Sequence, residues 1–144
     1  MSALSDIYAE IDARLGQLEG VEEYDRMPAG DPSAFPALQA YDGGDEPVEG
    51  EVGATRLTAL LTLEGYVEGY SGSAAHDQMT DLHATAVFAL CGDGGDLGGL
   101  VETIEISGGR RVGVTELSST RRLGFAQDFA ITFATERGNP ALRA

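Results

Sequence analysis

The sequence lacks lysine entirely and has a single cysteine, and each shortage excludes a class of site. One cysteine, Cys91, can form neither an intrachain disulfide nor a cysteine-rich zinc site. Without lysine there is no phosphate-binding loop that ends in Gly-Lys. The Gly-x-Ser-x-Gly turn of serine hydrolases and the Gly-x-Gly-x-x-Gly dinucleotide fingerprint are absent as well. Nothing in the sequence therefore indicates an enzyme, and we expect no catalytic residues and no cofactor.

Positive charge is also scarce, because the sequence has nine arginines and 24 acidic residues, which gives a formal net charge of −15. Proteins that grip nucleic acid or an anionic membrane surface need a basic face, so the balance argues against both. No apolar run is long enough to span a membrane, and the N-terminus lacks the basic and apolar regions of a signal peptide. We therefore expect a soluble protein made in the cytoplasm.

The length of 144 residues predicts one domain, which we place at 1–140 with a C-terminal tail over 141–144. Apolar residues at helical spacing predict a helix from Ser2 or Ser5 to Leu18 and a second helix over 74–90. Alternating or apolar runs predict strands over 35–41, 52–69, 100–106, 111–117 and 123–135. The predicted fold is α+β: a mostly antiparallel sheet with two helices packed on one face, in the order α-β-β-α-β-β, with room for a further short strand after the second helix.

Two details of these strands carry further expectations. Gly65 interrupts the long alternating strand, so we expect a β-bulge there. In the last strand, every second residue from Leu123 to Phe133 is large and apolar, apart from Gln127. Its opposite parity holds mostly small residues, which suits a face on which something packs: Gly124, Ala126, Asp128, Ala130, Thr132 and Ala134.

The segment 42–51 has five acidic residues and no base, and we interpret it as a flexible acidic loop. It is either a solvated turn or an arm that becomes ordered against a partner, since like charges keep such a segment extended. Its acidic residues are candidates for a subunit interface: Asp42, Asp45, Glu46, Glu49 and Glu51.

The arginines are unevenly distributed, because Arg110, Arg111, Arg121 and Arg122 lie within 13 residues of one another. They either solvate turns or bind carboxylates of another copy, for which the forked guanidinium group is well suited. A contact between unlike patches on successive copies closes into a ring when the rotation permits. We take these four arginines, with the acidic loop as their partner, as interface candidates.

Metal binding has little support in the sequence. His76 and His83 are seven residues apart, whereas a helical metal site usually pairs ligands three or four apart and needs a third ligand. The Asp93–Asp96 turn lacks the alternating oxygen ligands of a calcium loop, although weak divalent-cation binding there or at 42–51 stays open. Cys91, at the end of an apolar helix, is interpreted as a buried thiol.

The order of elements nevertheless resembles a known family. An N-terminal helix leads to the proline-flanked strand Phe35-Pro36-Ala37-Leu38, and an acidic gap precedes a long strand that ends Gly65-Tyr66-Val67. A helix then runs into Asp96-Leu97-Gly98-Gly99, and the last strand closes Ile131-Thr132-Phe133-Ala134-Thr135. From residue 3 to 140 this pattern is similar to the tail-terminator (tail-completion) proteins of long-tailed bacteriophages and gene transfer agents.

The resemblance implies a structural virion protein that forms a hexameric ring, assembled in the host cytoplasm. Such a ring caps the tail tube, stops its polymerisation and joins the tail to the head, with a tail tube protein and a head-side neck or stopper protein as partners. Six copies would carry a formal charge of about −90, so an acidic lumen would let DNA slide through without specific binding. The alternatives are another neck component, a stopper or adaptor, and a small cytoplasmic α+β enzyme or ligand-binding domain.

Overall fold

The structure is a computed structural model that describes residues 2–49, 52–69, 71–117 and 120–144, with the side chains of 115–121 excepted. Its helices are α1 (Ala3–Gly16) and α2 (Gly72–Cys91). Its strands are β1 (Glu23–Arg26), β2 (Ala37–Val48), β3 (Ala54–Gly69), β4 (Thr103–Leu117), β5 (Thr120–Glu136) and β6 (Asn139–Arg143). The predicted order of the main elements is confirmed, and β1 and β6 are short additions to it.

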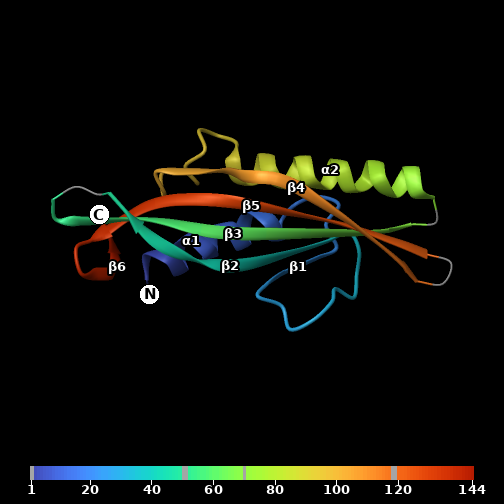
Figure 1. Cartoon of the computed structure of the whole chain (residues 1–144), viewed down its shortest axis with the longest axis horizontal. Coiled ribbons are helices and arrows are strands. Elements are labelled where there is room, and N and C mark those ends of the chain that lie inside the picture. Colours follow the sequence, from blue (N-terminus) through green and yellow to red (C-terminus); the bar gives the residue numbers. More distant parts are fainter. Residues whose placement is uncertain (1, 50–51, 70, 118–119) are drawn as a thin grey trace.

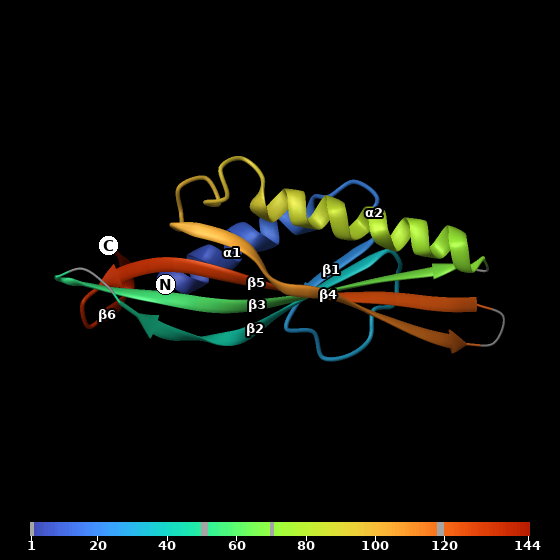
Figure 2. The same cartoon turned by 45° about the horizontal axis from the view of Figure 1, so that its top comes forward.

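All six strands form one sheet, in the order β1-β2-β3-β5-β4, with β6 pairing β5 beyond the start of β4. Of the described strand pairs, β1–β2 is parallel and the others are antiparallel. Both helices lie on the same side of this long, twisted sheet (Figures 1 and 2), and they share one core with the strands beneath them. The predicted α+β architecture is therefore confirmed, and neither of the described helices lies on the opposite face of the sheet.

Both helices begin at serines that satisfy free backbone N–H groups. Ser2 caps α1 in a reciprocal capping box with Ser5, and the Ser71 hydroxyl accepts a hydrogen bond from the backbone N–H of Ala74 at the start of α2. Each helix then buries one stripe at the predicted spacing, including Ile7 and Ile11 on α1. The helices are thereby fixed by local capping and by burial of an apolar face.

The predicted bulge at Gly65 is wrong, because β3 and β5 pair without a register shift through this position. Gly65 is needed for space instead. It lies opposite Phe125, and a Cβ built at Gly65 would stand 2.1 Å from the Phe125 ring. On the other face Gly124 makes the same kind of room for the Tyr66 ring. The aromatic rings thus cover the glycines of the neighbouring strand.

The two strands predicted over 100–106 and 111–117 are one strand, β4, which is bent by a bulge. The register with β5 shifts between Ser107 and Arg111, and Gly108 has a φ of 78°. Glycine adopts this left-handed conformation without steric cost, so the strand can bend without ending.

Two further expectations are corrected. The acidic segment is predicted to be a loop, but its residues as far as Val48 belong to β2 and pair with β3. A bulge interrupts this pairing between Asp42 and Asp45. Pairing with the strongly apolar β3 outweighs the low strand propensity of these residues. The C-terminal residues do not leave the fold either, since β6 pairs with β5 through Thr135 and Glu136.

Candidate assembly interface

The face of the sheet away from the helices is open, and its centre is polar. On β5 the side chains of this face are the small, half-buried ones predicted from the sequence. Asp128 stands among them and accepts hydrogen bonds from Thr62 on β3 at 2.7 Å and from Arg111 on β4 at 3.2 and 3.3 Å. The hydrogen bond from Arg111 holds the pKa of Asp128 below its ordinary value. This triad ties three strands together across the open face.

Two of the four candidate arginines lie near one another on this face, toward the β4–β5 hairpin. Arg111 and Arg122 both line a shallow hollow of about 360 Å³, floored by Gly113 and Gly124. The Arg122 guanidinium lies 4.7 Å from the centre of the Phe35 ring, a cation–π contact. Its Nη1 lies 3.8 Å from a carboxylate oxygen of the exposed Asp31, while its buried Nε has no hydrogen-bond partner among the described residues.

The other two arginines occupy different surroundings. Arg110 lies in the bulge of β4 and is exposed. Arg121 is on β5 opposite Gly69 of β3, and its side chain lies outside the described residues. The four arginines therefore share one half of the sheet, and Arg111 already has a carboxylate partner within its own chain.

The acidic candidates lie on β2 and in the residue that follows it. Asp42, Asp45, Glu46 and Glu49 are all exposed, and Glu51 lies outside the described residues. The β2–β3 hairpin and the β4–β5 hairpin project from opposite ends of the molecule (Figure 1). Among the described side chains, the structure therefore does not bring these acidic residues and arginines together within one chain.

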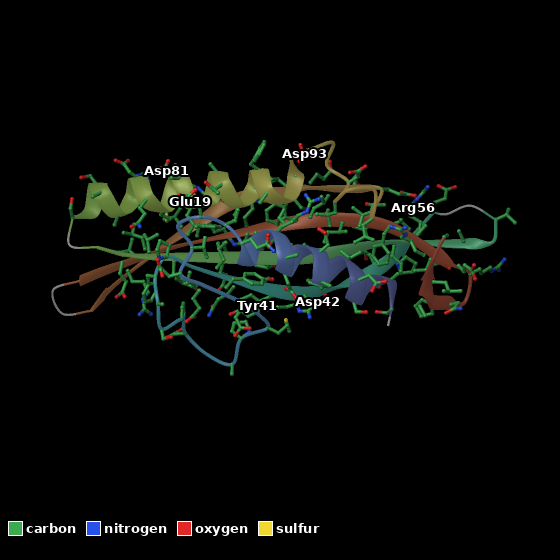
Figure 3. The ribbon with its side chains drawn as sticks, turned by 180° about the vertical axis from the view of Figure 1, so that it is seen from behind. Glu19, Tyr41, Asp42, Arg56, Asp81 and Asp93 are labelled. Carbon is green, nitrogen blue, oxygen red and sulfur yellow. The ribbon has the colours of Figure 1, made fainter. Side chains whose placement is uncertain are left out.

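Arg56 of β3 anchors the acidic hairpin. Its guanidinium pairs with Glu102 at 2.9 Å and donates a hydrogen bond to the Glu49 carbonyl at 3.2 Å. In Figure 3, Arg56 lies toward the end of the sheet away from the β4–β5 hairpin, whereas Asp42 lies nearer its middle. The acidic side of the sheet thus extends from the middle of β2 to the hairpin that Arg56 holds.

Sequence reasoning missed a polar network that joins α2 to the bulge of β4. Gln127 is buried on the core face, and its Oε1 lies 3.0 Å from His83 Nε2. Its Nε2 donates to the carbonyls of Gly108 at 3.2 Å and Asp128 at 3.1 Å, while His83 packs edge-on against Phe125. The available signal was Gln127 itself, a polar residue between the apolar Phe125 and Phe129 on the same face of the strand.

The described residues contain no cluster of three or more histidine, cysteine or acidic side chains that could hold a metal ion. His83 is committed to Gln127, and Asp93 adopts a left-handed conformation in the turn between α2 and β4. Burial raises the pKa of the half-buried Cys91 thiol, which disfavours its nucleophilic thiolate form. Over the described part of the chain, no helix is both long and apolar enough to cross a membrane.

Comparisons with known proteins give a likeness among solved structures. No family model matches the chain. No curated protein matches it either. Among solved structures, the chain is similar to a chain in the virion of a native gene transfer agent (GTA) particle. The two are 13% identical with a TM-score of 0.43, over 91% of this chain and 92% of that one.

Proposed function

We propose that this protein is a structural subunit of a phage-like tail, a terminator that forms a hexameric ring on the end of the tail tube. The ring stops polymerisation of the tube and provides the surface that joins the tail to the head. The terminator role and the number six come from the resemblance in sequence order described above. The partners are then a tail tube protein on one side and a head-side neck protein on the other.

The observation that supports self-assembly is the division of charge along the sheet. Exposed carboxylates gather on β2 and exposed arginine on the bulge of β4, at opposite edges of the sheet. Arg110 of one copy and Glu46 of the next are therefore suited to a heterologous contact, in which each subunit uses two different surfaces. A contact of this kind repeats around an axis and closes into a ring.

The excess of negative charge fits a channel for DNA. A ring of six chains carries a formal charge of about −90, and an acidic lumen repels the phosphate backbone rather than binding it. DNA would then pass through the ring without specific contacts. A basic channel in a structure of the assembled ring would contradict this part of the proposal.

The first experiment is the mass of the purified protein by light scattering, with and without millimolar magnesium to screen its acidic surface. The expected species has six times the 15.1 kDa mass of the chain. A strict monomer under every condition would contradict ring formation by the chain alone. It would shift the choice toward the alternative of a small ligand-binding domain.

Charge reversal tests which residues form the contact. Arg110→Glu, and separately Arg121→Glu with Arg122→Glu, should weaken the ring, and Glu46→Arg should restore it in the Arg110→Glu background. Arg137→Glu is the matched control, because Arg137 is exposed and follows the acidic end of β5. Unchanged assembly of the reversed variants would remove these arginines from the interface.

A neck stopper or adaptor is the nearest alternative, and its neighbour distinguishes it. A terminator binds the end of purified tail tubes, whereas a stopper or adaptor binds the head-side neck. Pelleting with tail tubes therefore decides between the two positions.

A further inference from the structure

Beyond its bulge, the edge of the sheet formed by β4 is apolar, and no described strand pairs with its outer side. β4 is the last strand in the order, and at its start the Gly95 carbonyl accepts a hydrogen bond from the backbone N–H of Ile104 at 2.8 Å. Val112 and Val114 face the helix side, opposite Phe125 and Leu123, yet they are 50% and 59% exposed. The reason is that α2 lies over β3 and β5 and leaves this part of β4 bare (Figure 2).

An edge of this kind invites pairing with another strand. It offers unpaired backbone groups beside β-branched apolar side chains, and residues 111–114 include neither a proline nor an acid. Proteins usually blunt such edges with prolines, charges or covering segments because bare edges associate. The β4 edge is therefore suited to being covered when the protein assembles.

The opposite free edge, on β2, has different properties. β1 pairs with β2 only as far as Ala40, and the N–H of Asp42 meets the Met27 sulfur at 3.2 Å. From there to Val48 no described strand pairs with the outer side of β2, which carries Asp42, Asp45 and Glu46. Within this segment the Gly44 N–H donates a local hydrogen bond to Asp42 Oδ1 at 2.8 Å, which a pairing strand would have to replace or leave in place. Pro47 has no N–H to donate, so pairing along this edge ends at Glu46.

We propose that the β4 edge of one copy pairs with the β2 edge of the next, through residues 111–114 and 41–46, so that the sheet continues from subunit to subunit. This inference rests on the proposed ring and names the surfaces that form it. Pairing of β4 with β4 would set arginines against arginines, and pairing of β2 with β2 would set acids against acids. Only the unlike pair brings opposite charges together, which makes the contact heterologous.

Strand direction agrees with this arrangement. β3 and β5 separate β2 from β4, and every neighbouring pair along this path is antiparallel, so β2 and β4 run in opposite directions. Rotation about an axis along the strands preserves direction, so β4 of one copy meets β2 of the next antiparallel. When the residue pairings are followed across β3 and β5, Tyr41 of β2 lies at the same position along the strand direction as Ser107 of β4. The two free segments are therefore staggered along the strands, as occurs when barrel strands tilt by about 35–45° from the axis.

Hydrogen exchange tests the pairing directly, with the full chain at low concentration, where it is monomeric, and at high concentration, where it is assembled. Outward-facing amides of residues 111–114 and 41–46 should exchange about 100-fold more slowly in the assembly than in the monomer. Amides of the outer face of α2 should exchange alike in both. A ring whose two edges exchange as fast as in the monomer overturns the strand pairing but leaves the ring itself standing.

Substitution at the edge supplies the second readout. Val112→Asp with Val114→Asp places carboxylates opposite the acids of β2 and should abolish the assembled species in light scattering. The matched control is Phe88→Asp, because Phe88 is 73% exposed and belongs to α2 rather than to either edge strand. Circular dichroism verifies that each variant is folded. Assembly of the folded double variant at the wild-type concentration overturns the inference, and a wild-type chain that stays monomeric overturns the ring together with it.

Discussion

Substitution of the strand glycines by alanine should destabilise the protein in proportion to the space that each glycine provides. At Gly65 an added Cβ would meet the Phe125 ring at 2.1 Å, and Phe125 is only 3% exposed, with His83 against its edge. The ring cannot move outward without disturbing the core. Overpacking of this kind costs about 1–3 kcal/mol, and we expect Gly65→Ala to lie near the upper end.

Two other strand glycines provide comparisons for the destabilisation expected of Gly65→Ala. At Gly124 the added Cβ would meet the half-buried Tyr66 ring at 3.0 Å, and this ring can shift toward solvent, so Gly124→Ala should cost less. At Gly113 an added Cβ would meet no described neighbouring atom within 4 Å, and the φ of this glycine is not left-handed. Gly113→Ala should therefore be neutral or stabilising by about 0.4–1 kcal/mol. The three variants therefore have a predicted order of free energies of unfolding.

Urea and thermal unfolding of the three variants measure this order. For a chain of this length, about 1 kcal/mol corresponds to roughly 4 °C in Tm. Phe125→Leu should relieve the clash, so its effect in the Gly65→Ala background should be smaller than in the wild type. A Gly65→Ala variant as stable as Gly113→Ala would refute the packing argument, because it would show that the Phe125 ring is free to move.

Three further predictions concern buried and paired polar groups. Gln127→Leu should cost about 1–3 kcal/mol of unfolding free energy, because it removes the partner of His83 and of the Gly108 carbonyl; urea denaturation measures it. The folded-state pKa of Asp128 is depressed, so the stability it contributes is present above its ordinary pKa and is lost as pH falls below about 4. Asp128→Asn should therefore unfold with a shallower acid dependence, and a curve parallel to the wild type would contradict this. Burial, and the hydrogen bond that Tyr24 donates to Asp12 at 2.6 Å, raise the pKa of Tyr24. The protonated Tyr24 phenol is therefore favoured in the folded state, and the stability that it contributes should be lost as pH rises above about 10. Tyr24→Phe should make the loss of stability with pH less steep in alkaline melts monitored by circular dichroism.

The sequence alone was sufficient for the elements whose physics is local. The apolar spacing of the two helices, with a serine at the start of the first, predicted where α1 and α2 lie, and the alternation of residues predicted β3 and β5. These signals are local because a cap or a buried stripe involves residues within a few positions of one another. The excess of acid and the grouping of the arginines are likewise properties of the sequence.

Only the tertiary structure decided what depends on pairing between distant segments. The acidic residues after Tyr41 became a strand because β3 lies beside them, against their own propensity. The role of Gly65 depended on Phe125, sixty residues away, and that of Gln127 on the bulge of β4. Strand order then placed β4 at one edge of the sheet and the part of β2 after Ala40 at the other, so that the described acids of β2 and arginines of β4 lie apart within one chain.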